Sequence, residues 1–349
     1  MSQVERLELR PGYSISRVIK GGWQLSGDHG AVEKEAAVRD MFAFVDSGIT
    51  TFDCADIYTG VEVMIGEFIS LLRRERGESA VDAIKVHTKF VPDYAQLDQM
   101  SFEYVQSIID RSLQRLQLEQ LNLVQFHWWD YGIPGYLETL HFLRQLQQAG
   151  KIDKISVTNF DGAHIKEICA SGIELVSSQV QYSLLDQRPM SDLTELCQTN
   201  NIHLFCYGVL AGGFLTDKWL GQPDPGFEFT NRSLVKYRLI IEEFGGWDLF
   251  QTLLRTMSAV ATKHHVDIST VATRYVLDQP QVAAAIIGAR YARYLPQTLS
   301  VFGFQLDGAD RDALGQVLAQ ASGPHGPVYA LERDKEGIHG RIMKYNLNA

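Results

Sequence analysis

Residues 84–127 read IKVHTKFVPDYAQLDQMSFEYVQSIIDRSLQRLQLEQLNLVQFH. The first and last parts, 84–89 and 121–127, are short runs rich in Val, Ile, Leu and Phe, a composition typical of buried strands. Between them, residues 101–116 have apolar side chains at helical spacing, and Ser101 is placed to cap the start of that helix. The predicted helical face carries Val105, Ile108, Ile109, Leu113 and Leu116. This stretch therefore predicts a strand, a helix and a second strand in succession.

The same alternation continues through most of the chain and predicts eight strands. They are expected at 18–22, 50–54, 84–89, 121–127, 155–158, 175–180, 204–207 and 284–287. Because eight β/α units follow one another without a break in composition, they favour one closed parallel barrel over two separate domains. The predicted fold class is α/β, with a single (β/α)8 TIM barrel domain over residues 1–349.

Two segments depart from this alternation. A long loop that contains Gly and Pro is expected between Gly208 and Trp247, after the seventh strand. From about residue 306 to residue 349 the chain is expected to form a C-terminal extension. A lid, an oligomer contact or a frayed end would each explain that extension.

The composition limits the classes of partner. A net charge of −10 over 349 residues argues against a general basic surface for nucleic acid or anionic lipid, although a local phosphate site is compatible with it. The four cysteines have no CxxC or framework spacing, which favours a reducing compartment. Neither a signal peptide nor an apolar run long enough to span a bilayer is expected. We therefore expect a cytoplasmic protein that acts without nucleic acid or membrane, as a monomer or homo-oligomer.

Four polar residues stand at or just after predicted strand ends. Asp53 ends the second strand, Tyr58 follows it, Lys89 ends the third strand and His127 ends the fourth. Taken singly, they would be a helix cap, a loop aromatic, a solvated strand end and a structural histidine. The carboxyl ends of barrel strands converge on one mouth, however, so the four together predict a catalytic group.

Reduction of a carbonyl requires a hydride at carbon and a proton at oxygen. Tyrosine, with an ordinary pKa of about 10, is a poor acid unless a nearby cation eases its ionisation. Lys89 would supply that cation, and Asp53 would neutralise and orient Lys89. His127 would hydrogen-bond the substrate oxygen or join the proton transfer. The four residue types therefore suit an enzyme that acts on carbonyl groups.

Six segments of the sequence resemble motifs of the aldo-keto reductase superfamily, and they occur in the same order and at approximately the same spacing. They are GITTFDCADIYTGVEVMIG (48–66), VHTK (86–89), LVQFHWWD (123–130), ISVTNF (155–160), SSQVQYSLLD (177–186) and AAIIGAR (284–290). The resemblance implies a nicotinamide cofactor held without a Rossmann domain, and no GxGxxG follows the first predicted strand. It also implies that Tyr58 is the general acid or base, with Asp53, Lys89 and His127 as its partners.

The resemblance further implies where the cofactor binds. The expected contacts are Gly22, Trp23, Asp53, Thr158, Asn159, Gln179, Tyr207, Gly208, Leu210, Gly212, Ile287, Gly288, Arg290, Gln297 and Thr298. Thr158 replaces the Ser usual in the family and keeps its hydroxyl. Tyr207 would stack on the nicotinamide ring. The segment of Gly288, Ala289 and Arg290 resembles the one that grips the adenosine phosphate, and a guanidinium there indicates NADPH, with NAD as the alternative.

Two departures from the family pattern affect the cofactor contacts. After Tyr207 the family expects Ser-Pro-Leu, whereas this chain has Gly208, Val209 and Leu210, so backbone amides near Gly212 and Gly213 would have to bind the pyrophosphate. Thr298 stands where many relatives have Asn, and Gln297 is its expected replacement.

The predicted substrate pocket combines catalytic and aromatic residues. Its expected members are Trp23, Tyr58, His127 and Trp128, with Trp129 as a further aromatic wall. Asp56 and Asp130 are candidate hydroxyl binders, with loop or helix-cap aspartates as the competing interpretation. No metal is expected, because His264 and His265 are adjacent on a predicted helix and no ligand cluster accompanies His87 or His127.

The sequence thus predicts an NAD(P)H-dependent oxidoreductase that reduces a small aldehyde, ketone or sugar, with Tyr58 as general acid. The same residues would serve a sugar or alcohol dehydrogenase that runs the reverse direction. A cofactor-binding regulatory subunit resembling potassium-channel β subunits is the alternative of another class, and it predicts cofactor retention with little turnover. An unrelated barrel hydrolase or lyase predicts no cofactor binding.

Overall fold

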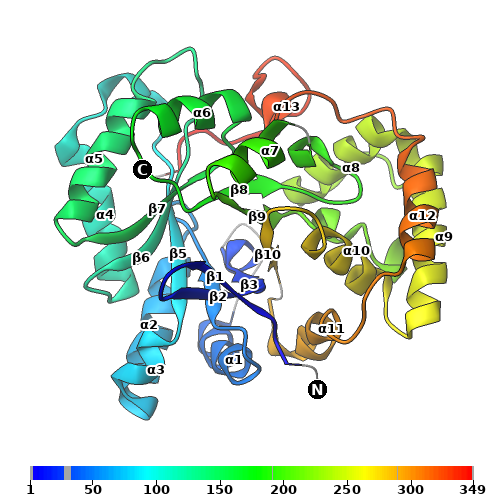
Figure 1. The fold of residues 1–349 in the computed structure, drawn as a ribbon, viewed down its shortest axis with the longest axis horizontal. Coiled ribbons are helices and arrows are strands. Elements are labelled where there is room, and N and C mark those ends of the chain that lie inside the picture. The colour runs from blue at the N-terminus through cyan, green and yellow to red at the C-terminus, as the bar shows by residue number, and fades with distance from the viewer. Residues whose placement is uncertain (1–2, 27–32, 191, 289, 348–349) are drawn as a thin grey trace.

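Eight parallel strands close into a barrel in the order β10, β3, β4, β5, β6, β7, β8 and β9 (Figure 1). The computed structural model describes residues 3–26, 33–190, 192–288 and 290–347. The barrel strands are Val18–Gly21 (β3), Thr51–Asp53 (β4), Lys85–Phe90 (β5), Leu121–Phe126 (β6), Ile152–Thr158 (β7), Ser177–Gln181 (β8), His203–Tyr207 (β9) and Val282–Ile287 (β10). Each overlaps one of the eight predicted strands, so the predicted (β/α)8 barrel is confirmed.

Helices surround the barrel on its outside (Figure 1). The described helices are Lys34–Asp46 (α1), Val61–Arg76 (α2), Glu78–Asp82 (α3), Phe102–Leu116 (α4), Tyr136–Gln148 (α5), Gly162–Ala170 (α6), Asp192–Thr199 (α7), Arg232–Phe244 (α8), Gly246–His264 (α9), Ile268–Leu277 (α10), Leu295–Ser300 (α11), Gly308–Leu318 (α12) and Ala330–Arg333 (α13). At the start of α4, the Ser101 hydroxyl accepts a hydrogen bond from the Tyr104 amide at 3.2 Å. The predicted cap of this helix is therefore confirmed.

An N-terminal hairpin that was not predicted closes one end of the barrel. Strands β1 (Arg6–Arg10) and β2 (Tyr13–Ser16) pair antiparallel, and they lie across the barrel in Figure 1. Their apolar side chains pack against interior residues of the barrel strands, namely Ile19, Leu123, Phe205, Ala283 and Ala284. Because the hairpin precedes the first barrel strand and fills the amino end, the open mouth lies at the carboxyl ends of the strands.

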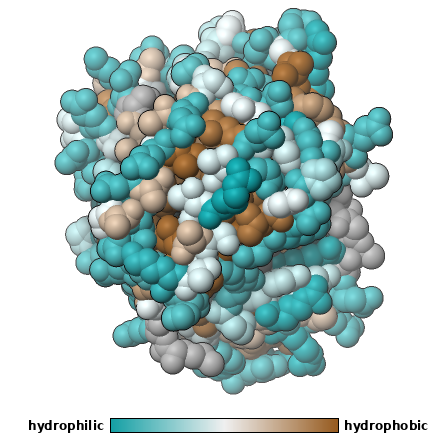
Figure 2. Space-filling model, turned by 90° about the vertical axis from the view of Figure 1, so that its right-hand side faces the viewer, coloured by the Kyte–Doolittle hydropathy of each residue, from teal (hydrophilic) through white to brown (hydrophobic). Residues whose placement is uncertain are grey.

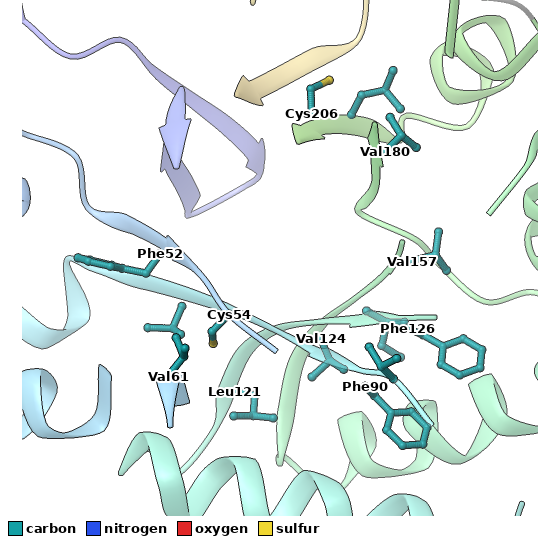
Figure 3. Close-up of a cluster of buried hydrophobic side chains, with 14 of the residues drawn as sticks. Phe52, Cys54, Val61, Phe90, Leu121, Val124, Phe126, Val157, Val180 and Cys206 are labelled. Carbon is teal, nitrogen blue, oxygen red and sulfur yellow. The ribbon is translucent and has the colours of Figure 1, made fainter. Parts of the chain in front are cut away.

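Residues of the barrel strands alternate between the helical layer and the interior. Figure 3 shows the outward side chains of this layer, among them Phe52, Val124, Phe126, Val157, Val180 and Cys206. Since side chains alternate along a strand, the neighbours of these residues face inward. The inward positions next to them in sequence are Asp53, Gln125, His127, Thr158, Gln179 and Tyr207. A buried apolar layer thus fixes the direction of the polar residues at the mouth.

The long loop and the C-terminal extension differ from their predicted bounds. Helix α8 occupies 232–244, so the irregular stretch after β9 ends at Asn231, whose side chain accepts the Ser233 amide at 2.8 Å and caps α8. In the extension, α12 packs through Leu314 and Val317 into an apolar cluster shared with α9. Only the chain after α12 leaves the outer ring, and α13 lies near α8 at the top of Figure 1.

The surface on the right-hand side of Figure 1 is mostly hydrophilic, with small hydrophobic areas between the polar residues (Figure 2). The exposed large apolar residues in the described ranges lie on separate elements: Val63, Met190, Phe227, Tyr294 and Ile338. Within those ranges, no helix combines the length and the apolar character that crossing a bilayer requires.

Candidate active site

The carboxyl ends of the barrel strands open into a pocket of about 820 Å³. Residues from β3, β4, β5, β7, β8, β9 and β10 contribute to its wall, together with His127 just after β6, α8, α10 and the C-terminal tail. Most of the predicted site residues line it: Trp23, Asp53, Tyr58, Lys89, His127, Thr158, Asn159, Gln179, Tyr207, Gly208, Leu210, Gly212, Ile287, Gly288, Arg290, Gln297 and Thr298. The structure therefore brings residues from distant parts of the sequence into one cavity.

Asp53 and Lys89 form a buried ion pair at the base of this pocket. Lys89 Nζ lies 2.6 Å from Asp53 Oδ2 and donates to the Cys54 carbonyl oxygen at 2.8 Å. Burial alone would lower the pKa of the Lys89 ammonium, but attraction to Asp53 and Tyr58 raises it above its ordinary value. Lys89 therefore remains charged beside Tyr58.

Two glutamines, of which only one was predicted as a site residue, bind the other carboxylate oxygen of Asp53. Gln179 Nε2 donates to Asp53 Oδ1 at 2.7 Å, and Gln125 Nε2 donates to the same oxygen at 2.9 Å. Gln179 was predicted as a cofactor contact, whereas Gln125 was missed. The only feature of the sequence that could have identified Gln125 was its inward-facing position between Val124 and Phe126. With both oxygens of Asp53 hydrogen-bonded, its orientation toward Lys89 is fixed.

Tyr58 lies directly over this ion pair. The Lys89 ammonium is 4.8 Å from the centroid of the Tyr58 ring, and the Trp23 ring packs against Tyr58 with 4.9 Å between ring centroids. Burial raises the pKa of the Tyr58 hydroxyl, while Lys89 opposes that increase through its charge and a hydrogen bond. Tyr58 is therefore protonated at neutral pH and stands beside a cation able to stabilise its phenolate.

His127 faces the pocket from the end of β6 and is neutral. Its Nδ1 lies 3.2 Å from the Thr158 carbonyl oxygen, which can only accept, so Nδ1 carries the ring proton. Burial, followed by the charge of Arg333, lowers the pKa of the imidazole to about 3. Nε2 is a buried hydrogen-bond acceptor without a partner in the described part of the chain. This nitrogen is available to accept a hydrogen bond from a ligand hydroxyl.

Thr158, Asn159 and Tyr207 form a polar wall next to His127. Asn159 has a φ of 63°, a left-handed conformation that asparagine tolerates better than most residues. Its Oδ1 accepts a hydrogen bond from the Tyr207 hydroxyl at 2.8 Å. The Asn159 amide nitrogen is thereby oriented as a donor, and the Thr158 hydroxyl donates to the Gln179 carbonyl oxygen at 3.2 Å.

The loop after Tyr207 passes closely under α8. Gly208 and Gly212 have φ values of 70° and 65°, which favour glycine. A Cβ on either residue would lie within 2.6 Å of the Tyr237 side chain. These two glycines thus let Tyr237 pack onto the loop, and they leave backbone rather than side chains facing the pocket.

The far end of the pocket is formed by residues after β10. The guanidinium carbons of Arg290 and Arg293 lie 5.3 and 4.7 Å from the Tyr291 ring centroid. Gln297 donates to the Ser269 hydroxyl at 3.0 Å, and the Thr298 hydroxyl donates to the Tyr294 carbonyl oxygen at 3.0 Å. Ala289, predicted as part of this segment, lies outside the described residues.

Two predicted contacts do not line the pocket. Gly22 lies behind the wall, where a Cβ would meet the Asp53 carbonyl oxygen and Val61 at 2.7 Å, so its role is close packing. Trp128 has no exposed area, and its indole nitrogen donates to the Ile133 carbonyl oxygen at 3.0 Å. Because side chains alternate after His127, Trp128 points outward and Trp129 lines the pocket instead.

The two candidate hydroxyl-binding aspartates have local partners. Asp56 is buried and accepts the backbone amides of Ile57 and Val91, which makes it a loop-stabilising group. Asp130 accepts hydrogen bonds from the Gly132 amide, the Tyr94 hydroxyl and the Lys335 ammonium. Neither residue lines the pocket, so the loop-aspartate interpretation holds for both.

Much of the pocket cover was missed from sequence. It comprises Ser233, Lys236 and Tyr237 on α8, Ser269, Thr270 and Thr273 on α10, and Tyr329, Ile342, Met343, Lys344 and Leu347 in the tail. Trp23 Nε1 donates to the Ser233 hydroxyl at 3.2 Å, which joins the first βα loop to α8 above the pocket. No local pattern distinguished these residues from an ordinary helix face or chain end.

The charge of the pocket fits an anionic ligand with several phosphates. Its described lining includes the cations Lys89, Arg232, Lys236, Arg290, Arg293 and Lys344, against the single carboxylate Asp53. The whole chain, in contrast, has a net charge of −10. The cations gathered in this cavity therefore suit a ligand that carries phosphate groups. The described residues contain no group of three or more His, Cys, Asp or Glu side chains able to hold a metal ion.

Comparison with known proteins adds independent evidence. The chain is 25% identical over 336 residues to the aldo-keto reductase YhdN of Bacillus subtilis, covering 94% of this chain and 97% of that one. It is 24% identical over 326 residues to the NADH-specific methylglyoxal reductase of Escherichia coli, covering 87% and 95%. Among solved structures, the glycerol dehydrogenase AKR11B4 of Gluconobacter oxydans superimposes with a TM-score of 0.74 at 24% identity, covering 93% and 97%, a likeness of fold alone. The model of the Aldo/keto reductase family matches residues 17–319, and the chain belongs to that family.

Proposed function

We propose that this protein is an NADPH-dependent reductase of small aldehydes, ketones or sugars, with Tyr58 as the general acid. The observation that carries the proposal is the convergence of Tyr58, the Lys89–Asp53 ion pair and His127 on one end of a cationic pocket. Arginines line the other end. A pocket built in this way suits an enzyme that holds a phosphorylated cofactor next to a proton donor.

The residues present fit a nicotinamide dinucleotide. Asn159, Thr158 and Gln179 would hold the carboxamide, and Tyr207 would stack against the ring. Backbone amides around Gly208 and Gly212 would face the pyrophosphate, and Arg290 would pair with the adenosine phosphate. A reduced nicotinamide held there supplies a hydride to the substrate carbon.

The protonation states assign the acid to Tyr58 rather than His127. The only ring proton of His127 is directed to Thr158, and with a pKa of about 3 the imidazole has no proton at Nε2 near neutral pH. Tyr58 therefore donates its proton to the carbonyl oxygen, and the Lys89 ammonium stabilises the resulting phenolate. Nε2 of His127 accepts a hydrogen bond from the hydroxyl that forms. Alcohol oxidation would use the same groups in reverse.

The proposed substrate site is lined mainly by aromatic side chains. Trp23, Trp129 and Tyr329 surround Tyr58 and His127, and Ile342 and Met343 of the tail complete the wall. These apolar and aromatic groups would limit the water around the reacting oxygen, and desolvation strengthens the polar contacts that this oxygen makes with Tyr58 and His127. The similarity to a methylglyoxal reductase supports a small aldehyde as the first compound to assay.

The cofactor preference rests on the arginine end of the pocket. Arg290 and Arg293 can neutralise a 2′-phosphate, which favours NADPH over NADH. The relative from Escherichia coli is named as NADH-specific, so NADH is the alternative.

Fluorescence titration with NADPH and then NADH tests the proposal directly. Saturable quenching of the tryptophan emission, tighter with NADPH, is expected, followed by cofactor-dependent turnover of methylglyoxal and glyceraldehyde. Tighter binding of NADH would reverse the assignment of Arg290. Absence of binding to either cofactor would remove the proposed function, and cofactor retention without turnover of any carbonyl compound would favour a regulatory subunit.

A further inference from the structure

Arg333, the last residue of α13, joins the ends of two barrel strands from the C-terminal tail. Its Nη1 donates to the Asn159 carbonyl oxygen at 2.8 Å, and its Nη2 donates to the Trp128 carbonyl oxygen at 2.9 Å. Trp128 directly follows His127, and Asn159 directly follows Thr158. The guanidinium thus bridges β6 and β7 immediately beyond the residues that face the pocket.

The same strand ends are also joined from the inside. His127 Nδ1 donates to the Thr158 carbonyl oxygen at 3.2 Å, so imidazole and guanidinium close a ring of contacts around the two strand ends. Arg333 is further fixed by aromatic faces, with its guanidinium carbon 4.1 Å from the Tyr131 ring centroid and 5.3 Å from that of Tyr329. A planar guanidinium with two parallel donors sets the separation of two acceptors more strictly than a single ammonium does.

The tail does not depend on Arg333 for its docking. Glu332 is buried and pairs with Arg188 at 3.0 Å and with Lys236 at 3.7 Å. Arg188 in turn binds both oxygens of Asp186, at 2.9 and 2.7 Å. This buried network holds α13 against α8 and the segment after β8, so loss of Arg333 would leave α13 in place.

We propose that Arg333 is a positioning residue that sets the orientation of His127 and Asn159, and through them the geometry of hydride and proton transfer. This inference rests on the proposed function, because those two residues are its reactive and cofactor-binding groups. Arg333 itself does not line the pocket and has no expected contact with a ligand. Its effect is therefore on turnover, since a shift of about 1 Å in a catalytic group can cost on the order of 100-fold in rate.

The test compares Arg333→Met, Arg333→Lys and Arg341→Met. Arg341 lies in the same tail, its side chain is 65% exposed, and its ion-pair partner Glu336 is 3.8 Å away, so it is a matched control. We expect Arg333→Met to lower kcat by about 10- to 100-fold with KM for aldehyde within about threefold of wild type. Arg333→Lys should recover part of kcat because an ammonium reaches one carbonyl, and Arg341→Met should match wild type.

Stoichiometric NADPH titration gives the fraction of folded sites, so kcat is expressed per binding site. A rise in KM in proportion to the loss of kcat, or wild-type kcat in Arg333→Met, would overturn the proposal. If Arg333→Met does not fold, Arg333→Lys decides the question. Its kcat should then lie clearly below that of wild type at unchanged KM, and equality with wild type would overturn the proposal.

A second readout needs neither cofactor nor turnover. In the NMR spectrum of the ¹⁵N-labelled protein, the His127 Nδ1 proton should exchange slowly with water, and exchange should be faster in Arg333→Met than in Arg341→Met. Equal exchange in the two variants would contradict a positioning role. If wild type reduces no carbonyl compound, the proposed function fails, whereas the exchange comparison still decides whether Arg333 orients His127.

Discussion

The strand-end cluster and the mouth cover, the two parts of this pocket, are held in place by different interactions. The strand-end cluster is Asp53, Lys89, Gln125, His127 and Gln179, and these residues lie on paired parallel strands in which Lys89 stands opposite Gln125. Backbone ladders hold it, and side-chain hydrogen bonds complete it. Its geometry is therefore part of the barrel itself.

The mouth cover is Lys236, Tyr237, Tyr329 and Glu332, whereas Arg333 binds the strand ends next to the cluster. These residues come from α8 and the tail, and ionic contacts such as Arg188 with Glu332, 144 positions apart, hold them together. No sheet fixes their positions. The contrast indicates that the catalytic step and the binding of substrate depend on different regions. A change in the cluster should therefore alter kcat, and a change in the cover should alter KM.

The largest expected effect comes from removal of the Tyr58 hydroxyl. Tyr58→Phe should lower kcat by about 10²- to 10⁴-fold, because the proton donor is lost. The affinity for NADPH should stay within about twofold, since the ring still packs against Trp23. Steady-state kinetics and cofactor titration check both parts. Full activity in this variant would transfer the acid role to another residue.

A change in Glu332 should act on the cover and leave the cluster intact. Glu332→Gln removes the buried negative charge that pairs with Arg188 and Lys236. Because these cations would then lack part of their compensating charge, the free energy of unfolding should fall by about 3 kcal/mol. The loosened Tyr329 wall should raise KM for aldehyde about tenfold, equivalent to about 1.4 kcal/mol, with a smaller loss of kcat than Arg333→Met causes, because Arg333 itself is still present. Urea denaturation and initial rates measure the two effects. A fall in kcat at constant KM would show that the two regions are coupled.

The arginine end of the pocket should affect cofactor choice alone. Arg290→Ala should weaken NADPH binding about tenfold, or about 1.4 kcal/mol, and leave NADH binding unchanged, because only NADPH carries the extra phosphate. Competitive titration with both cofactors provides the measurement, with NADH as the internal control. Equal weakening of both would assign Arg290 to a phosphate that the two cofactors share.

The smallest expected effect on turnover concerns a histidine below the pocket, which acts on stability alone. His87 is buried against Phe205 and Tyr13, and burial, followed by the charge of Lys89, lowers the pKa of its imidazole to about 3. The unfolded chain binds this proton near pH 6.5 and the folded chain does not. Stability from this group is therefore complete above about pH 6.5 and is lost as the pH falls toward 3.

His87→Gln should accordingly reduce the slope of unfolding free energy against pH by about 1.4 kcal/mol per pH unit between pH 4 and 6. Urea denaturation at several pH values measures this slope. His141→Gln, at an exposed position on helix α5, is the control for the replacement of a histidine by glutamine. An unaltered slope in His87→Gln would mean that His87 is protonated in the folded protein.

The sequence by itself determined the barrel and the strand-end cluster. Apolar alternation marks each strand, and period-two geometry dictates that Asp53, Lys89 and His127 share the inner face at the carboxyl end. The same alternation predicts that Gln125 faces inward, because it precedes the outward-facing Phe126. It also predicts that Trp128 faces outward, because it follows the inward-facing His127. These features are local, so a linear pattern contains them.

Only the tertiary structure decided what covers the pocket. Tyr329, Glu332 and Arg333 lie in a tail without helical or strand periodicity, and their partners Arg188, Asn159 and Trp128 are more than a hundred positions away. Burial of an ionic network depends on the path of the whole chain around the barrel. Contacts between distant segments produce no periodic pattern in the sequence, so the spacing of residues does not reveal that path.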